Sequence, residues 1–319
     1  MRALLQWVTL GALALGLTAP ALAQDAGPPP PDEARVLGVY APRLAFDSGV
    51  ARSRYAADLA AALTQATGLP FKGRGFASSG AFAEQVAAGK VTVALVDAQV
   101  QARRGFTALA QGQQGGRPAA PLVLVVAPGV KGDGLLALKG KRLADVPVDT
   151  GDAGFVANFL MQGEVAGEFF KAGRSAHDVQ GAVALVKLGK ADAAFTPADR
   201  TEGLRTVFRS RPVPLPVLVL VDASLPAEQA AALRQAAPRL KVPGPLDGFG
   251  AVDSGGLQAL RGSLGKPRQR EAQPVMVAAP VNLGPVAAFP ATARSAQVAE
   301  PPGGLAEALG VPEPPAERF

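Results

Sequence analysis

The chain of 319 residues contains no cysteine, a single histidine and few aromatic residues, which make up 5% of it. Without cysteine there can be no disulfide, thiol catalysis, zinc–thiolate site or lipid anchor on a cysteine. One histidine, His177, cannot build a metal site that needs several histidines. The net charge of +6 is modest, and no aromatic residues interleave with the basic ones, so we expect no nucleic-acid partner.

Sequence motifs of common enzymes are also missing. No G-x-S-x-G nucleophile elbow accompanies the histidine. Gly73-Arg74-Gly75 lacks the later glycine of a dinucleotide-binding fingerprint. We therefore expect a protein that is not an enzyme and that has no catalytic residue, metal or cofactor.

Residues 1–23 have the pattern of a secretory signal peptide. Arg2 supplies the positive charge, residues 3–17 are largely apolar, and an Ala-Leu-Ala cleavage site at 21–23 precedes Gln24. The apolar run is too short for a membrane span. We expect the mature protein to be soluble and periplasmic, and not a lipoprotein.

Proline is concentrated at the two ends of the mature chain. Residues 24–34 form a Pro-rich linker, and ten prolines fall within residues 263–319. Because proline interrupts helices and central strands, this C-terminal segment is expected to be an extended or disordered tail.

A unit of a helix, a glycine and a short apolar strand occurs twice, 100 positions apart. Gly89-Lys90 and Gly189-Lys190 each follow an apolar helical pattern and precede a strand. Ser78-Ser79 and His177-Asp178 are pairs suited to capping the two helices at their starts, and each glycine suits a left-handed helix end. Two such units facing each other would form a cleft walled by polar helix ends, which indicates a two-lobed ligand binder.

Between the two Pro-rich ends, the chain alternates strands and helices. Asp97 and Thr196 end equivalent strands, at the edge where α/β sheets bind ligands. A Gly-bearing loop at 149–155 opens a helix that runs to Met161. Residues 102–118 are expected to form a loop with one short strand. The expected strands are 35–40, 71–76, 91–96, 106–110, 122–127, one near 143, 206–209 and 217–221, and the other expected helices are 52–67, 80–88, 224–237 and 247–262.

Several segments, taken in order, resemble one family. They are residues 36–40, the unit at 89–95, residues 121–126, Leu-Lys-Gly-Lys-Arg-Leu at 138–143, Ser-Ala-His-Asp at 175–178, Gly-Lys-Ala-Asp-Ala-Ala at 189–194 and residues 219–226. Together with the signal peptide they resemble the phosphate/phosphonate-type substrate-binding proteins of ABC transporters. The resemblance covers residues 35–260 and leaves out the tail.

The resemblance implies an α/β, two-lobed type II periplasmic binding protein fold with a Pro-rich, mostly irregular C-terminal tail. Lobe 1 would comprise residues 35–117 plus 226–262, and lobe 2 residues 118–225. The lobes would close about a hinge on a small-molecule ligand, which is then delivered to an ABC permease.

The resemblance also implies where the ligand binds. In this family the loop corresponding to 151–155 carries hydroxyl residues that hold an oxyanion, whereas Asp152 and Ala153 stand there in this chain. A carboxylate would repel phosphate, so the expected ligand is a small anionic or polar solute. The candidate ligand-binding residues are Tyr40, Ser78, Ser79, Asp97, Thr150, Asp152, Gly154, His177 and Thr196.

Each candidate also has a structural interpretation. His177 either donates to the ligand or lies on the surface before a cap, and the resemblance favours the ligand. Asp178 suits a helix cap better than a ligand contact, and Phe155 is expected in the core. Tyr40 is either a ligand contact or a core aromatic. Ser78, Ser79, Asp97, Thr150, Asp152 and Thr196 either contact ligand or cap local turns.

An alternative function belongs to another class. A binding-protein fold can lose transport and act as an interaction or sensory module in the cell envelope. The departures at Asp152 and Ala153 and the Pro-rich tail motivate this alternative, in which residues 263–319 would bind an envelope protein.

Overall fold

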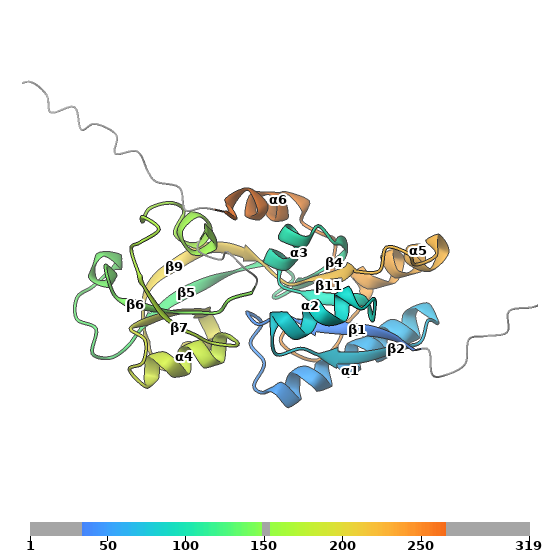
Figure 1. Ribbon diagram of the computed structural model, residues 1–319, viewed down its shortest axis with the longest axis horizontal. Helices are drawn as coiled ribbons and strands as arrows, with labels where there is room; N and C mark the ends of the chain where they lie inside the picture. The colour runs from blue at the N-terminus through green and yellow to red at the C-terminus, as the bar shows by residue number, and fades with distance from the viewer. Residues whose placement is uncertain (1–33, 149–153, 266–319) are drawn as a thin grey trace, which may run out of the picture. The chain divides into compact units, whose positions relative to one another are not determined.

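The computed structural model describes residues 34–148 and 154–265, which fold around two β-sheets connected by helices (Figure 1). The fold is α/β, as expected. Within the described residues, no helix combines the length and apolar character needed to cross a membrane.

The first sheet has six strands in the order β11-β4-β10-β3-β1-β2. β1 pairs in parallel with β2 and β3, while β10 pairs antiparallel with β3 and β4. Every residue of β3 is buried, which explains its continuous apolar run. The strand bounds are β1 Arg35–Tyr40, β2 Phe71–Gly75, β3 Val91–Val96, β4 Thr107–Gln113, β10 Val217–Leu220 and β11 Gly248–Gly250.

Helices cover both faces of the first sheet (Figure 1). One face of the sheet is covered by α1 (Gly49–Thr67), α5 (Ala227–Ala236) and the 3-10 turn η4 (Ala237–Arg239). These elements and the strands share one hydrophobic cluster. α2 (Ser79–Ala87) and α3 (Ala98–Arg104) pack on the other face. This second apolar cluster continues into the second sheet.

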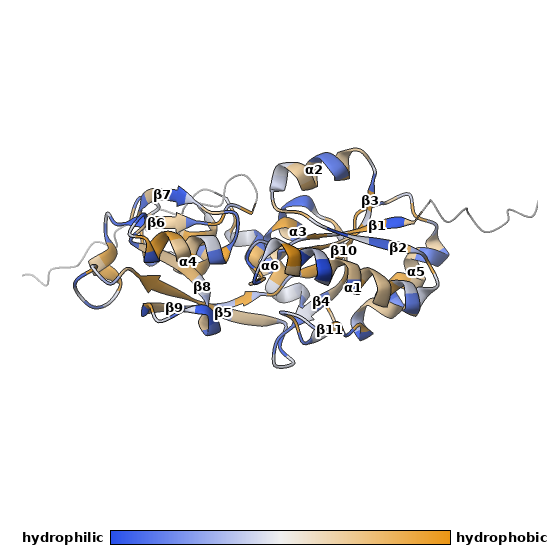
Figure 2. Cartoon of the chain, turned by 90° about the horizontal axis from the view of Figure 1, so that it is seen from below, coloured by the Kyte–Doolittle hydropathy of each residue, from blue (hydrophilic) through white to orange (hydrophobic). Residues whose placement is uncertain are grey.

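The second sheet has five strands in the order β7-β6-β8-β5-β9. β6 is parallel to β7 and β8, while β5 is antiparallel to β8 and β9. The polar β7 is an edge strand, and its hydrophilic colour shows in Figure 2. The bounds are β5 Ala119–Val126, β6 Arg142–Asp145, β7 Lys171–Ser175, β8 Ala193–Pro197, β9 Arg205–Pro214, α4 Val179–Lys187, the 3-10 turns η1 Leu135–Leu138 and η3 Ala198–Arg200, and the π-helix η2 Phe155–Leu160.

The duplicated unit is confirmed as a duplicated topology. The strand orders β2-β1-β3 and β7-β6-β8 match. The residue numbers of β7 are those of β2 plus 100, and the same holds for α4 and α2. Ser78 and Asp178 are the N-caps of these two helices. Gly89 and Gly189 both have φ of 65°, the left-handed conformation expected just after each helix.

The chain crosses between the sheets twice, from β4 to β5 and from β9 to β10. The strand expected at 217–221 therefore belongs to the first sheet, although it falls within the expected second lobe, residues 118–225. Its backbone pairs with β3 on one side and with β4 on the other, and so completes the first sheet. The entry and exit of the second sheet lie side by side, since Ala119 pairs with Pro214.

Three local expectations differ from the structure. Residues 102–104, expected in a loop, end the helix α3, whose buried face includes the polar Gln99 and Gln101. The edge strand β7 was not expected, because its sequence has no apolar alternation. The single helix expected at 247–262 divides into β11 and α6 (Ser254–Ser263), with Asp253 as the cap of α6.

α6 is in contact with elements of both sheets. Arg261 Nε donates to the carbonyl of Ala102 in α3 at 2.9 Å. Two residues further along the same C-terminal end of α6, the carbonyl of Ser263 accepts from Asn158 Nδ2 of η2 at 3.0 Å. The helix thus joins the first sheet to the second at a third place, besides the two crossovers.

Candidate ligand-binding site

Tyr40 stands at the carboxyl end of β1 and bonds to the second lobe. Its side chain is 2% exposed, and its ring stacks on Phe82 of α2 with centroids 5.3 Å apart. The hydroxyl donates to the carbonyl of Val148, beyond β6, at 2.9 Å. Tyr40 is therefore both a core aromatic and a polar contact between the lobes.

Arg43 follows β1 and also reaches across. Its backbone N–H donates to Asp97 Oδ2 at 3.0 Å, which holds the loop after β1 against the end of β3. Its guanidinium donates to the carbonyl of Val146 at 3.0 Å. The same group lies 4.4 Å from the ring centroid of Phe155, at the start of η2. The charge is thus placed between the ends of β1, β3 and β6.

A cavity of about 90 Å³ lies beside Arg43. Since about 10–15 Å³ of such space already holds one water molecule, the cavity has room for a small solute. Its walls come from both sheets and from the strands that connect them, and much of the lining is apolar. Polar lining residues include Arg43, Asp97, Gln99, Gln114, Asp199 and Arg200.

The charges around the cavity are balanced. Arg200, in η3, donates to Asp47 of the first lobe at 2.9 Å and lies 3.9 Å from Asp199. Asp97 is 4% exposed, whereas the Asp199 side chain is 74% exposed. The Asp97 carboxylate is therefore buried and lies near the half-buried Arg43, whereas Asp199 and Arg200 form a second, more exposed pair.

Of the predicted ligand-binding residues, Asp97 lines this cavity. Thr196 is fully buried, its hydroxyl donates to the Arg200 carbonyl at 3.3 Å, and the next residue, Pro197, lines the cavity. The structure thus brings Asp97 and the end of β8 together, as expected for two equivalent strand ends. Thr150 and Asp152 lie outside the described residues.

Gly154 begins η2 and is buried. A Cβ at this position would lie 2.1 Å from the carbonyl oxygen of Gly265, so no larger residue fits without movement. The start of η2 is therefore packed against the chain that follows α6. Phe155 is fully buried, which confirms its expected place in the core.

The two helix starts predicted to face the ligand do not line the cavity. Ser78 Oγ caps α2 by accepting from the N–H of Ala81 at 3.2 Å, and Ser79 is half-buried in its first turn. His177 is exposed. Asp178 caps α4 by accepting from the N–H of Gly181 at 2.9 Å, as its sequence position predicted.

Sequence reasoning missed Arg43 and Arg200. Both are arginines in loops or turns, where no periodic pattern indicates their direction. The partners of Arg43 are Val146 and Phe155, more than a hundred positions away. A weak signal was available, because each arginine closely follows one of the strand ends that the sequence did identify.

The family segments at 138–143 and 189–194 meet in the second lobe, at the starts of β6 and β8. Arg142 donates through Nη2 to Asp192 Oδ1 at 2.9 Å and through Nε to Oδ2 at 3.1 Å. It also donates to the carbonyl of Gly189 at 3.0 Å. Hydrogen bonding to Arg142 holds the pKa of Asp192 below its usual value. These segments therefore hold β6 and β8 of the second lobe together, and they do not line the cavity.

Comparisons with known proteins agree with this fold. A family model described as "ABC transporter, phosphonate, periplasmic substrate-binding protein" matches residues 44–242. A comparison with curated proteins gives no match.

Solved structures with a similar fold include proteins of three bacteria. A binding protein component of an ABC phosphonate transporter (PA3383) from Pseudomonas aeruginosa has 15% identity and a TM-score of 0.57, over 72% of this chain and 85% of that one. PhnD1 from Prochlorococcus marinus, in complex with methylphosphonate, has 16% identity and a TM-score of 0.57, over 72% and 97%. XAC2383 from Xanthomonas citri, bound to ATP, has 16% identity and a TM-score of 0.53, over 72% and 96%.

Two β-sheets with helices, joined by two crossovers and with a cavity at their strand ends, have the fold of type II periplasmic binding proteins. The chain belongs to the family of periplasmic phosphonate-type substrate-binding proteins of ABC transporters. This family consists of solute-binding proteins and not of enzymes, and its members carry small molecules to an ABC importer in the periplasm.

Proposed function

We propose that this chain binds a small solute with an acidic group in the cavity between the two sheets, and that Arg43 recognises that group. The observation that carries the proposal is the position of the Arg43 guanidinium. It lines the cavity and contacts the second lobe at both Val146 and Phe155.

A guanidinium suits this role for two reasons. It remains charged at any physiological pH, and its planar set of donors matches the geometry of carboxylate, phosphate or phosphonate. Apolar walls lower the local dielectric, which strengthens the attraction to an anion relative to water. Because Arg43 also touches both lobes, an anion bound to it would favour the closed arrangement.

The carboxylates near Arg43 narrow the choice of solute. Asp97 and Asp199 also line the cavity, and a second negative charge beside them is unfavourable. A solute that carries an amine as well as its acidic group would satisfy both signs of charge. We therefore expect an aminophosphonate or a similar zwitterion to bind more tightly than a simple dianion.

Among the sequence predictions, Tyr40, Asp97, Gly154 and Thr196 fit this proposal as residues that build the cavity or its surroundings. His177, Ser78, Ser79, Thr150 and Asp152 stay predictions. An envelope partner for residues 263–319 also stays a prediction, since nearly all of that segment lies outside the described residues. The family supports delivery of the solute to an ABC permease.

Isothermal titration calorimetry of the mature protein tests the proposal. The panel is methylphosphonate, 2-aminoethylphosphonate, inorganic phosphate and acetate. Arg43→Gln should weaken binding of the best solute by at least about tenfold, as expected for the loss of a hydrogen bond to a charged group. The matched control is Arg234→Gln on the exposed face of α5.

Two outcomes would contradict the proposal. Binding that survives Arg43→Gln but is lost in His177→Ala would move the site to the start of α4. A failure of all four solutes to bind would exclude these acidic groups as the recognised feature.

A further inference from the structure

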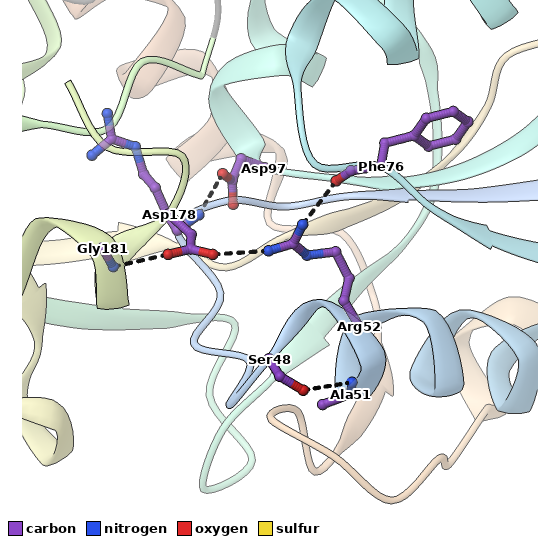
Figure 3. A network of polar contacts seen from close by, with 8 residues as sticks. Ser48, Ala51, Arg52, Phe76, Asp97, Asp178 and Gly181 are labelled. Carbon is purple, nitrogen blue, oxygen red and sulfur yellow. Dashed lines mark hydrogen bonds and ion pairs between the residues drawn. The ribbon is translucent and has the colours of Figure 1, made fainter.

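A buried arginine of the first lobe pairs with an aspartate of the second, away from the cavity. Arg52 lies on α1, and its side chain is 7% exposed. Its Nη2 donates to Asp178 Oδ2 at 2.9 Å, while Nη1 donates to the carbonyl of Phe76 at 3.2 Å (Figure 3). Among the described residues that line the cavity, neither Arg52 nor Asp178 is included.

One carboxylate of Asp178 performs two tasks at once. Oδ1 caps α4 by accepting from the N–H of Gly181, and Oδ2 accepts from Arg52 (Figure 3). The next residue, Val179, donates its backbone N–H to the carbonyl of Pro42 in the first lobe at 3.2 Å. The start of α4 is therefore attached to the first lobe at two adjacent points.

The duplicated unit allows the cap at Asp178 to be compared with the cap at the corresponding position of the first lobe. Ser78 caps α2 with a neutral hydroxyl at the corresponding position of the first lobe. Serine, asparagine and aspartate cap helices about equally well. The negative charge at Asp178 is thus unnecessary for the cap, and the contact that uses it is the ion pair with Arg52.

We propose that the Arg52–Asp178 pair is an interlobe clasp that sets the balance between open and closed forms of the ligand-free protein. Opening separates a mostly buried guanidinium from its carboxylate, so the pair stabilises the closed form. Apparent ligand affinity is proportional to the fraction of protein in the binding-competent form. Arg52 and Asp178 therefore act as positioning residues that tune affinity without touching the ligand; this effect on affinity rests on the proposed function.

The chain offers a clean way to measure opening. It has no cysteine, so two introduced cysteines can carry a pair of spin labels without background. Val50 at the start of α1 and Leu188 at the end of α4 are 79% and 67% exposed and belong to different lobes. Val50→Cys with Leu188→Cys, measured by pulsed electron resonance without ligand, reports the distance distribution between the lobes.

Asp178→Asn is the main variant, because asparagine keeps the cap and removes the charge. We expect its ligand-free distances to shift towards longer values. Arg52→Gln should give the same shift, and the double variant should shift no further than either single one, because all three remove one interaction. Ser78→Ala, the control, removes a cap in the first lobe and should leave the distances unchanged.

An unchanged distribution in Asp178→Asn and Arg52→Gln would overturn the clasp, as would shifts that add in the double variant or an equal shift in Ser78→Ala. Thermal unfolding of each variant identifies any variant that fails to fold. If one of the two single variants does not fold, the distance distribution of the other one tests the clasp. For the best-binding solute of the panel, we expect Asp178→Asn to raise Kd about tenfold, which corresponds to about 1.4 kcal/mol. The distance measurement needs no ligand, so it stands even if none of the four solutes binds.

Discussion

At the scale of single residues, Arg142 and Asp192 join two segments of the second lobe that lie 50 positions apart in the sequence. The two side chains share two hydrogen bonds, and the Arg142 backbone N–H adds a third to Asp192 Oδ2 at 2.7 Å. Because hydrogen bonding to Arg142 favours the ionised carboxylate, the pKa of Asp192 is lower in the folded protein than in the unfolded chain.

This lowered pKa gives a pH dependence with a definite sign. The contribution of Asp192 to stability is present above the unfolded pKa of about 3.9 and is lost as pH falls through the lower, folded pKa. Asp192→Asn should therefore lower Tm at pH 7 by about 2–4 °C and weaken the dependence of Tm on pH below about pH 4. Thermal unfolding from pH 2.5 to 7 measures both effects.

The exposed Asp58 on α1 provides the matched control, since Asp58→Asn removes a carboxylate of the first lobe. An equal loss of Tm in the two variants would mean that the Arg142 contacts contribute nothing specific.

Residue-level prediction from the sequence worked where the local chain decides the geometry. Asp97 and the end of β8 could be placed because they follow apolar strands, and Asp178 because it precedes a helix. Arg43 could not be placed, because its direction depends on Val146 and Phe155 in the other lobe. Contacts between lobes leave no periodic pattern in the sequence.

At the scale of elements, the two copies of the helix–glycine–strand unit allow a comparison within one molecule. Gly89 and Gly189 have the same φ of 65°. A Cβ at either position would meet no atom within 4 Å, so the backbone conformation alone opposes a larger residue. The two glycines should therefore respond alike to substitution.

We expect Gly89→Ala and Gly189→Ala each to lower the free energy of unfolding by about 1 kcal/mol, the cost of a left-handed conformation for alanine. Gly80→Ala is the control, because Gly80 lies in the first turn of α2 with no atom within 4 Å of its Cβ position. There alanine should be neutral or stabilising. Urea unfolding measures all three, and an equal loss at Gly80 would contradict this explanation.

Helices and strands could be predicted from the sequence where their buried side consists of apolar residues, and were missed where it does not. β1, β3 and α1 follow clear apolar patterns and were expected close to their observed bounds. α3 buries glutamines on the face that a pattern of apolar residues would mark, and β7 is a polar edge strand. In both cases tertiary packing, and not local hydrophobicity, determines the element.

At the scale of the whole described chain, one face of the first sheet has a core that comes almost wholly from the first lobe. β1, β3, α1 and α5 supply most of it, and β10 and Leu246 complete it. The positions where the chain leaves and re-enters this lobe are adjacent, because the Leu215 N–H donates to the Pro118 carbonyl at 2.8 Å. The second lobe is therefore inserted between two neighbouring points of the first.

This adjacency predicts that the first lobe can be isolated. Replacing residues 119–214 by a short Gly-Ser link should leave a protein that unfolds cooperatively and keeps the first sheet. A chain ending at Pro214 retains β1 to β4 but lacks β10, and it should not form this sheet. Circular dichroism melting and amide hydrogen exchange would distinguish the two, and a cooperative fold in the second chain would contradict the role given to β10.

The position of β10 between β3 and β4 also means that neighbouring strands of the first sheet are synthesised at different times. The ribosome delivers β3 and β4 early, but the strand that lies between them in the sheet follows the entire second lobe. Until β10 emerges, the first lobe has the three-stranded part β2-β1-β3 and the separate strand β4, because β11 follows β10 in the chain, and its core is incomplete. A protein of a periplasmic family must cross a membrane, and this late-arriving strand delays its folding until almost the whole described chain has been made.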